Sequence, residues 1–432
     1  WTLLMALVHL LPLPAEYFSL AVMLLGAAIL IGNILVVYRI VQALDPAARF
    51  APLIAAGTTA FYFPLVFWTL RGLEAGALAL ILSLSILLSL RLAAAPDPAG
   101  TAWLALSLAA ALIIRMDAAI PVTLILIYLA GKAPRAAVLP AITSVLVLAG
   151  ILLVQRWYFG DFLPNTYYLK VVGVPAWERI RAGLSALVDY ASRDFLMPLF
   201  VALLGVLLYR GMRGPEAGLL LALFLGQAAY SVWVGGDYAE ELVDSANRFI
   251  AQGMPALIIL FSLVLERAIR RAPNLQLKAA TALLIAAGAV IVMSGEPWYR
   301  WALVNAPMLR TDIQRTKLGL HIEEYTGAAA VIAVHAAGQI PYYSDRTTID
   351  LLGKNDPVIA KGPPASAFAP GHNKWNYEYS IVQLQPDVVA DNFNRLRDFM
   401  ENQPGYLLLP NGIYVRRDST LVDAEGLGQD YR

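Results

Sequence analysis

Long apolar stretches recur through the first two-thirds of this 432-residue chain, and they constrain its fold more than any other feature. About 20 consecutive apolar residues are enough for a helix to cross the hydrocarbon layer of a membrane. Soluble proteins average about 45–50% apolar and about 25% charged residues, whereas this chain has 59% and 15%. The sequence therefore predicts a polytopic α-helical membrane protein and disfavours a water-soluble globular enzyme.

Ten stretches qualify as candidate spans, and several of them are short, as is common in bundles with tilted or partly re-entrant segments. Their approximate bounds are Phe18–Tyr38, Ala51–Leu70, Glu74–Leu90, Thr101–Ile114, Ala118–Gly131, Val138–Gln155, Leu196–Tyr209, Ala217–Val234, Ile250–Leu265 and Ala279–Met293.

The connections between these stretches differ in charge on the two sides of the predicted bundle. One side carries 11 basic and 4 acidic residues, and the other, up to the last span, carries 8 basic and 11 acidic residues. Short cytoplasmic loops are enriched in Lys and Arg, so the first side is expected in the cytoplasm and the second outside, across a bacterial plasma membrane. The net charge of +1 gives no general attraction to nucleic acid.

The composition changes near Gly295, where a tail with 13 basic and 16 acidic residues begins. We therefore expect a membrane domain at 1–294 and an outward-facing α/β soluble domain at 295–432. Strands are predicted at Ala329–His335, Thr347–Leu352, Val388–Ala390, Tyr406–Leu409 and Ile413–Arg416, with a helical stretch at Asp391–Glu401. Residues 177–188 have the apolar spacing of an amphipathic helix on the outer membrane surface.

Several chemistries lack the residues that they need. The chain has no Cys, which removes thiolate catalysis, Cys-ligated metals and disulfides. It has no glycine-rich nucleotide loop, nucleophile elbow or Asp-x-Asp pair, and its four histidines lack metal-ligand spacing. No metal site and no certain cofactor are predicted, and whether a divalent metal assists is left open.

Polar clusters occur instead at the predicted outward ends of the spans. Ionisable groups at membrane depth are costly and usually face a bundle interior or a cavity, so their convergence on one face predicts a site at the outer boundary. Three of the clusters also have a structural explanation: an ion pair closing a turn at 71–74, a local pair at 115–117, and a helix stop at 235–237. The clusters are Arg71-Gly72-Leu73-Glu74, Arg115-Met116-Asp117, residues 158–170, Gly235-Gly236-Asp237 and Arg248.

With these strings in order, the chain resembles the GT-C superfamily of integral-membrane glycosyltransferases. The resemblance is nearest to the bacterial group that includes the terminal arabinofuranosyltransferase of mycobacterial cell-wall arabinan. Besides the clusters above, the matching strings include Gly160-Asp161-x-Leu163-Pro164-Asn165-Thr166-Tyr167-Tyr168-x-Lys170, Pro341-Tyr342-Tyr343-Ser344, Ile349-Asp350-Leu351-Leu352-Gly353-x-Asn355-Asp356 and Pro370-Gly371-His372.

The resemblance implies a GT-C-like bundle that transfers a sugar from a polyprenyl-phosphate donor to a glycan or lipid acceptor on the outer face. Cations would bind the phosphate leaving group, and a carboxylate would accept the proton of the attacking hydroxyl. The candidate phosphate ligands are Arg115, Lys170 and Arg248, and the candidate catalytic carboxylates are Asp161 and Asp237. The candidate sugar or acceptor contacts are Glu74, Asp117, Asn165, Tyr168, Asp350, Asp356 and His372.

That group opens with one more span and an outward acidic loop bearing its catalytic aspartate. This chain begins at Trp1-Thr2-Leu3-Leu4, in a string that follows that loop in the group, so we expect the span and loop upstream. Two alternatives remain open: a transporter or flippase of lipid-linked sugars, and a non-catalytic scaffold of envelope assembly. The identity of the sugar and of the acceptor is also left open.

Overall fold

The computed structural model describes residues 1–14, 17–237, 247–270, 274–306, 308–391, 393 and 395–431. Its contacts divide the chain into two units. A helical unit comprises Trp1–Phe162 and Arg181–Val304, and a sheet unit comprises Leu163–Ile180 and Asn305–Arg432. Five charges that entered the loop comparison, Glu16, Glu240, Glu241, Asp244 and Arg271, lie outside the described residues.

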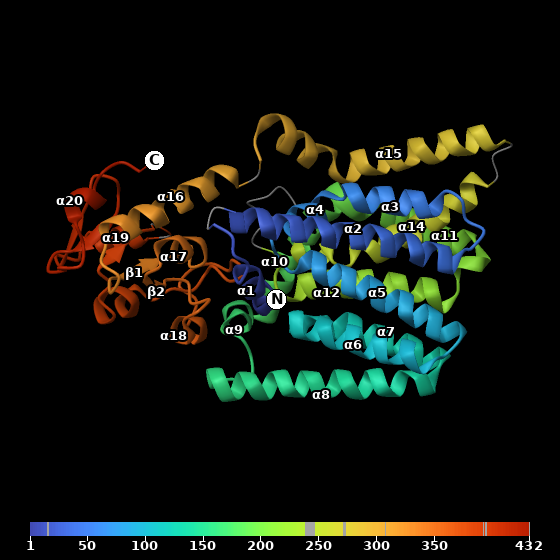
Figure 1. Cartoon of the computed structure of the whole chain (residues 1–432), viewed down its shortest axis with the longest axis horizontal. Coiled ribbons are helices and arrows are strands. Elements are labelled where there is room, and N and C mark those ends of the chain that lie inside the picture. The colour runs from blue at the N-terminus through green and yellow to red at the C-terminus, as the bar shows by residue number, and fades with distance from the viewer. Residues whose placement is uncertain are drawn as a thin grey trace. The chain divides into compact units, whose positions relative to one another are not determined.

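The helical unit is a set of helices whose axes run alongside one another (Figure 1). Its α-helices are α1 (Thr2–His9), α2 (Phe18–Leu44), α3 (Ala51–Phe61), α4 (Phe63–Leu70), α5 (Ala75–Ala94), α6 (Pro98–Ile114), α7 (Ala119–Lys132), α8 (Pro134–Phe159), α11 (Leu196–Leu208), α12 (Pro215–Trp233), α13 (Arg248–Ala251), α14 (Met254–Ile269) and α15 (Leu275–Tyr299). Short 3₁₀ or π segments connect them at η2 (Met116–Ala118), η3 (Ala191–Phe195), η4 (Arg210–Met212) and η6 (Arg300–Val304). Helix α10 (Ala176–Tyr190) contains the boundary between the two units.

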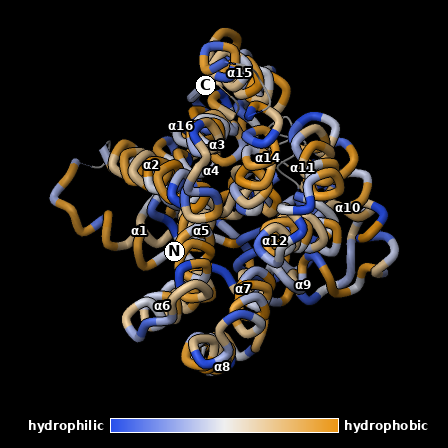
Figure 2. Tube along the Cα trace, turned by 90° about the vertical axis from the view of Figure 1, so that its right-hand side faces the viewer, coloured by the Kyte–Doolittle hydropathy of each residue, from blue (hydrophilic) through white to orange (hydrophobic). Residues whose placement is uncertain are grey.

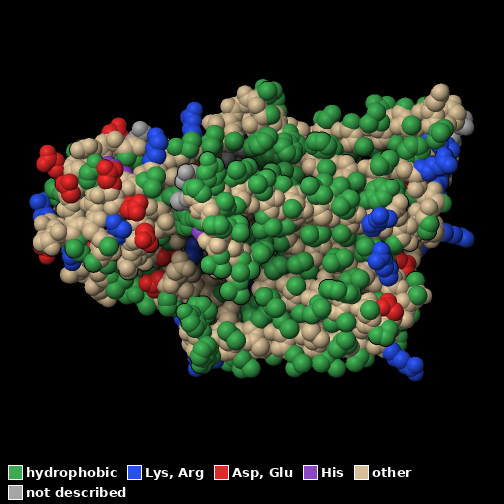
Figure 3. Space-filling view, in the orientation of Figure 1, with side chains coloured by type: hydrophobic (Ala, Val, Ile, Leu, Met, Phe, Trp, Pro, Cys, Tyr) green, Lys and Arg blue, Asp and Glu red, His purple; other side chains and the backbone are tan. Residues whose placement is uncertain are grey.

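The outer helices of this unit expose apolar side chains instead of burying them. On α8, for example, Leu146 is 66% exposed, and on α15 Leu284 is 72% exposed. Figure 2 views the helices nearly end on and shows hydrophobic residues along α2, α8 and α15 at the periphery. Figure 3 shows hydrophobic side chains covering the flank of the helices, with Lys and Arg gathered toward one end. Such a surface fits a hydrocarbon solvent.

Within the residues that the structure describes, six helical stretches are long and apolar enough to cross a membrane, and a seventh if the bent pair α3–α4 counts as one span. The predicted number of ten is therefore too high by this measure. Helices stand at the other three predicted places, but α6, α7 and α14 have only 17, 14 and 16 residues. Their lengths have local causes: the chain breaks at 115–117 between α6 and α7, and Gly253 and Pro255 start α14 late.

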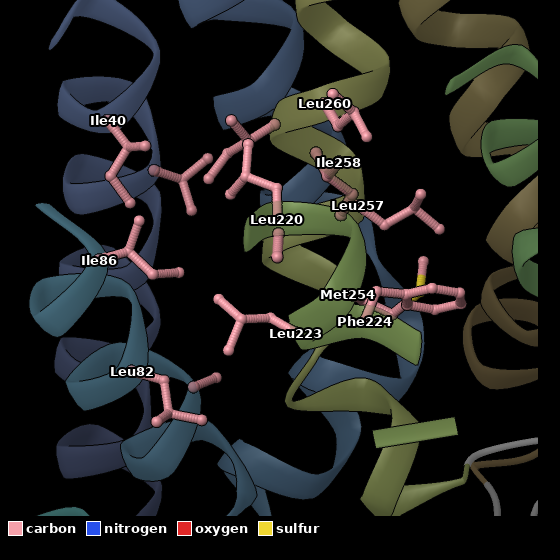
Figure 4. Close-up of a cluster of buried hydrophobic side chains, with 14 of the residues drawn as sticks. Ile40, Leu82, Ile86, Leu220, Leu223, Phe224, Met254, Leu257, Ile258 and Leu260 are labelled. Atoms are coloured by element: carbon pink, nitrogen blue, oxygen red, sulfur yellow. The ribbon is translucent and has the colours of Figure 1, made fainter. Parts of the chain in front are cut away.

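The core of the helical unit lies around α14, whose residues are nearly all buried. Side chains from α2, α5, α12 and α14 face one another in this core (Figure 4). The labelled members are Ile40, Leu82, Ile86, Leu220, Leu223, Phe224, Met254, Leu257, Ile258 and Leu260. Dispersion contacts among such side chains, rather than a hydrophobic driving force, hold helices together in lipid.

Helices α3 and α4 are bent by 53° at Tyr62. Pro64 lies in the first turn of α4, where its ring prevents α3 from continuing. The backbone groups freed at the break find partners on α15: the Phe63 N–H donates to Ser294 Oγ at 3.0 Å, and Trp298 Nε1 donates to the Phe61 carbonyl at 2.8 Å. These bonds satisfy groups that would be costly to leave unpaired in a bilayer.

The predicted amphipathic helix at 177–188 is present as α10. It continues through the π-helical turn η3 into α11, so residues 176–208 form one helical stretch of 33 residues. Its position on the membrane surface stays a prediction.

The sheet unit contains five strands in the order β2-β1-β3-β5-β4. The strands are β1 (Val331–Val334), β2 (Thr347–Asp350), β3 (Val388–Val389), β4 (Tyr406–Leu408) and β5 (Tyr414–Arg416). β1 pairs in parallel with β2 and β3, and β5 pairs antiparallel with β3 and β4. The remaining elements are α9 (Asn165–Val171), α16 (Leu309–Tyr325), α17 (Gln339–Ser344), α18 (Pro357–Lys361), η7 (Glu378–Gln383), α19 (Leu396–Met400) and α20 (Ala424–Leu427).

Alternating side chains of these strands build a core on each face of the sheet. Ile332 and Val334 pack on one face with α16, while Ala333 packs on the other with Leu351 and Met400. The five predicted strands are confirmed with slightly shorter bounds, and the predicted helix at 391–401 is reduced to α19. Helix α15 runs past the predicted boundary at Gly295, because its apolar face continues to Tyr299.

Candidate functional site

Two helices of the helical unit end in the same glycine turn, and each turn is followed by a carboxylate. After α4, the N–H groups of Gly72 and Leu73 donate to the carbonyls of Thr69 and Trp68. After α12, Gly235 and Gly236 donate in the same pattern to Val232 and Ser231. This is the Schellman motif, whose left-handed residue favours glycine, and Gly72 and Gly235 have φ of 76° and 90°.

The residue that follows each motif is acidic: Glu74 in the first case and Asp237 in the second. The predicted helix stop at Gly235-Gly236 is therefore present, and it also delivers Asp237 to a defined place. Glu74 and Asp237 thus reach the same end of the helices through equivalent turns at the ends of α4 and α12.

Arg115 joins two carboxylates. It ends α6 in an extended conformation, and its Nε and Nη2 donate to the two oxygens of Asp117, both at 2.8 Å. Its Nη1 donates to Glu74 Oε1 at 2.8 Å. The side chain of Arg115 is 17% exposed. The predicted local pair at 115–117 is therefore present. In place of the predicted ion pair between Arg71 and Glu74, Glu74 binds Arg115, and the Arg71 guanidinium lies over the Phe67 ring.

Arg248 forms the second ion pair. It is the first residue of α13, which Asn247 caps by accepting the N–H groups of Phe249 and Ile250. Arg248 Nε and Nη2 donate to Asp237 at 2.8 and 2.7 Å, and its backbone N–H donates to the same carboxylate at 3.1 Å. The side chain of Asp237 is only 1% exposed.

An aromatic ring brings the two pairs together. The guanidinium carbon of Arg115 lies 5.2 Å from the centre of the Phe249 ring, and that of Arg248 lies 5.9 Å from it. Arg248 also lies 5.3 Å from the Trp68 ring. We name Glu74, Arg115, Asp117, Asp237 and Arg248, with the Phe249 ring, the arginine–carboxylate cluster.

The cluster has three carboxylates and two guanidiniums, so its formal charge is −1. Each guanidinium makes a two-point contact with a carboxylate, the strongest arrangement available to such a pair. Five N–H donors per guanidinium exceed the number directed at carboxylates. Each guanidinium therefore has N–H groups that are not directed at a carboxylate. Its charge is already neutralised by acids, and an incoming anion would have to displace them.

Asp161 lies in a local turn. Gly160 ends α8 with a left-handed φ of 73°, and Asp161 then accepts the Phe162 N–H at 2.7 Å. This contact positions the connection between α8 and α9. A role for Asp161 as a base stays a prediction.

The segment carrying Asn165, Tyr168 and Lys170 forms α9 and belongs to the sheet unit. Asn165 donates to the Lys354 carbonyl at 3.4 Å, and the Lys361 ammonium lies 5.2 Å from the centre of the Tyr168 ring. Lys374 donates to the carbonyls of Tyr168 and Ala360 at 2.9 Å each. Because Lys170 is in the other unit from Arg115 and Arg248, convergence of the three cations stays a prediction.

Lys374 was not anticipated from the sequence. It is almost completely buried, and burial lowers its pKa. Its neighbour Asn373 is also buried, with both side-chain polar atoms unpaired. Nothing in the sequence distinguishes this lysine from an exposed one, because its partners are backbone carbonyls of distant segments.

Asp350 and Asp356 hold turns in this structure. Asp350, at the end of β2, accepts the N–H groups of Leu352 and Asn355 at 2.9 and 2.8 Å. Asp356 caps α18 by accepting the Val358 N–H at 2.8 Å. Their backbone contacts account for both carboxylates structurally, and acceptor binding by either stays a prediction.

His372 faces Lys354, whose Nζ lies 3.1 Å from His372 Nε2, while His372 Nδ1 lies 3.0 Å from the Pro370 carbonyl. The lysine donates to the imidazole, and the imidazole donates to the carbonyl. His372 belongs to the predicted acceptor set and Lys354 does not, and acceptor binding by His372 stays a prediction.

His335 and Asp391 follow two neighbouring parallel strands, β1 and β3. Open α/β sheets bind ligands beside the carboxyl ends of strands at such a place, where the strand order reverses. His335 is 6% exposed and lies 3.3 Å from the Tyr377 hydroxyl, and Asp391 accepts the Ala336 N–H at 3.0 Å. Burial lowers the pKa of His335 to about 3. The signal that could have found this edge is a polar residue at the end of one predicted strand, His335, and another directly after the next, Asp391.

Among the described residues, no group of three or more His, Asp or Glu side chains is arranged to hold a metal ion. The carboxylates of the arginine–carboxylate cluster bind arginines.

A comparison with protein-family models finds a match in the C-terminal part of the chain. Residues 306–430 fit the model of a protein family described as a domain of unknown function (DUF8728). No curated protein is similar enough to match the chain. The matched residues cover the strands and most helices of the sheet unit, so that unit is the part of the chain similar to a recognised domain.

Proposed function

We propose that this chain is a membrane glycosyltransferase of GT-C type, which moves a sugar from a polyprenyl-phosphate donor to a cell-envelope glycan or lipid. The observation that carries this proposal is the placement of Arg115 and Arg248 on one Phe249 ring, at one end of apolar helices. A lipid-linked phosphate needs a hydrocarbon phase for its chain and cations at the boundary of that phase. The helical unit offers both.

The carboxylates of the cluster give the proposal a binding step. A phosphate oxygen approaching Arg248 competes with Asp237 for the same donors, because both anions favour two-point contact with a guanidinium. Exchange of Arg248 from Asp237 to the phosphate releases a carboxylate beside the sugar. The same exchange applies to Arg115 and Asp117.

The released carboxylate then has a chemical task. The acceptor hydroxyl oxygen attacks the anomeric carbon, and the bond from that carbon to the phosphate oxygen breaks. The electron pair leaves with polyprenyl phosphate, whose growing charge the guanidiniums stabilise. The hydroxyl proton passes to a carboxylate, for which Asp237 and Asp161 are the candidates.

Charge distribution supports an orientation. The connections with 11 basic residues would lie in the cytoplasm, which puts the cluster and the sheet unit on the outer side of a bacterial plasma membrane. There the sheet unit would bind the acceptor glycan, with the Lys354 ammonium beside His372 as a donor to its hydroxyl groups.

Binding of a radiolabelled polyprenyl-phosphate sugar to the chain in lipid nanodiscs tests this function. We expect Arg115→Gln and Arg248→Gln each to weaken donor binding at least tenfold. Arg193→Gln, at an exposed arginine of η3 on the same predicted side, is the matched control and should bind as the unchanged chain does. Equal binding by all four proteins would contradict the phosphate assignment.

A transporter of lipid-linked sugars is the second candidate, and the bent pair α3–α4 is the observation that favours it. Transporters often carry broken helices near their substrate sites. Full-length protein in proteoliposomes with donor and acceptor distinguishes the two activities. Sugar transferred to acceptor supports the enzyme, whereas donor moved between leaflets without transfer supports the transporter.

A further inference from the structure

A cavity of about 400 Å³ lies at the end of the helices remote from the arginine–carboxylate cluster. Helix α5 shows the separation, because Glu74 directly precedes its first residue and the cavity contacts its last residues, Ala93 and Ala94. With 20 residues, α5 spans roughly 30 Å at 1.5 Å per residue. The cavity is therefore a separate feature on the opposite side of the apolar region.

An apolar wall covers about half of the cavity. The side chains that provide this wall come from five helices and the η4 turn, and the large ones are Leu44, Leu90, Met212, Leu220, Leu260 and Leu263. The apolar part suits the carbons of a lipid, and the polar part beside it suits a charged headgroup.

The polar part of the cavity has two cationic side chains, Lys132 and Arg267, and one carboxylate, Glu216. Lys132 pairs with Glu216 at 2.9 Å, and the Tyr128 hydroxyl donates to the same carboxylate at 3.3 Å. Arg267 donates to the Gly211 carbonyl at 3.4 Å, and within the described part of the chain it forms no ion pair. An anion entering the cavity would therefore meet Arg267 without displacing an acid.

More positive charge surrounds this end. Arg210 and Arg213 belong to the connection that contributes Gly211 and Gly214 to the wall. Figure 3 shows Lys and Arg side chains gathered at this end of the helices. Basic pockets between membrane helices, on the side rich in Lys and Arg, are suited to anionic lipid headgroups.

From these observations we propose that the cavity is a binding site for an anionic phospholipid. Its phosphate contacts Arg267, and the first carbons of its acyl chains pack on the leucine wall. The site is independent of the donor site, and it makes the protein selective for a membrane that contains acidic lipid.

A single-cysteine probe tests the site, because the chain has no native Cys. Ala94→Cys places an environment-sensitive fluorophore at the exposed rim of the cavity. The purified full chain is titrated with short-chain phosphatidylglycerol, with phosphatidylcholine of the same chain length, and with glycerol phosphate. We expect saturable binding of phosphatidylglycerol at least tenfold tighter than that of phosphatidylcholine, and no response to glycerol phosphate.

Three variants of the labelled protein test separately how the charge of Arg267, the volume of the cavity and an unrelated loss of charge affect phosphatidylglycerol binding. Arg267→Gln should weaken phosphatidylglycerol binding about tenfold, and Ala217→Leu should abolish it by filling the cavity while leaving every charge in place. Arg91→Gln removes an exposed charge on α5 that does not line the cavity, and it should have no effect. Equal affinity for the two lipids, equal loss in Arg91→Gln and Arg267→Gln, or binding of glycerol phosphate would each overturn the proposal.

Discussion

The helical unit and the sheet unit of this chain both bury apolar cores, but they expose different kinds of residue. In the helical unit Leu146 is exposed while Asp237 is enclosed, and in the sheet unit Leu351 is enclosed while Arg397 and Glu401 lie in water. The difference follows from the solvent that each unit is built for. A large apolar side chain is neutral toward lipid and costly in water, and the converse holds for a charge. The same type of substitution should therefore have opposite consequences in the two units.

Removing one member of an ion pair should give the largest contrast. Arg248→Ala leaves Asp237 buried without its partner, which costs roughly 3–5 kcal/mol. Arg397→Ala in the sheet unit breaks an exposed i, i+4 pair with Glu401, which is worth only about 0.5 kcal/mol. Thermal denaturation of the two variants in the same detergent measures the difference.

The double variant Arg248→Met with Asp237→Leu sharpens this result. It removes both charges, so most of the lost stability should return while donor binding stays weak. Recovery of both properties would contradict a binding role for the pair, and recovery of neither would show that the cluster is required for folding alone.

Truncating a leucine should have the reverse pattern. Leu351→Ala creates a cavity in the core of the sheet unit and should cost about 2–5 kcal/mol. Leu146→Ala changes a side chain on α8 that is 66% exposed, and we expect a change within about 0.5 kcal/mol. Amide hydrogen exchange in β1 and in α8 reports each unit separately. Equal destabilisation by the two variants would refute the assignment of α8 to a lipid environment.

Acid should weaken the sheet unit through His335. The native pKa of about 3 is below the ordinary value of 6.5, so the unfolded chain binds the proton first as the pH falls. Stability is then complete above about pH 6.5 and decreases toward pH 3, by up to about 3 kcal/mol at pH 4. His335→Gln should remove this pH dependence from the exchange rates of β1 and β3 amides. An unchanged profile in the variant would exclude His335 as its source.

Cysteine labelling should leave stability nearly unchanged and report only orientation. Ala95→Cys lies in the exposed connection after α5, and Thr166→Cys lies on the exposed face of α9. In intact cells a membrane-impermeant maleimide should modify Thr166→Cys alone, and permeabilised cells should show both modified. The opposite pattern would invert the proposed orientation.

Much of the architecture follows from local sequence pattern. Apolar stretches located the long helices of the helical unit, and short apolar runs located the five strands, whereas α16 was not predicted. The prediction of membrane-spanning length was wrong for α6, α7 and α14, because Arg115, Pro134 and Gly253 set the ends of these helices. Apolar composition extends beyond such breaks, and composition alone therefore overcounted the spans.

The sequence predicted the charged residues of the candidate site, but it did not predict which of them contact one another. The glycines after α4 and α12 mark helix ends, and the acids that follow them were visible in the sequence. Arg71 and Arg115 were both available to Glu74, and only the packing of α5 against α6 selects Arg115. The Phe249 ring that links the two arginines is one apolar residue among many, with no local signal of its role.

The break between α3 and α4 has a consequence for synthesis of the protein. The partners of Phe63 and Phe61 are Ser294 and Trp298, at sequence separations of 231 and 237 residues. At roughly 5–20 residues per second of translation, about 10–50 s pass before those partners are made. The backbone groups at the break after α3 therefore gain their partners only when α15 has inserted. Truncation before Ser294 would leave these groups unpaired in the bilayer, where membrane quality control could recognise the protein.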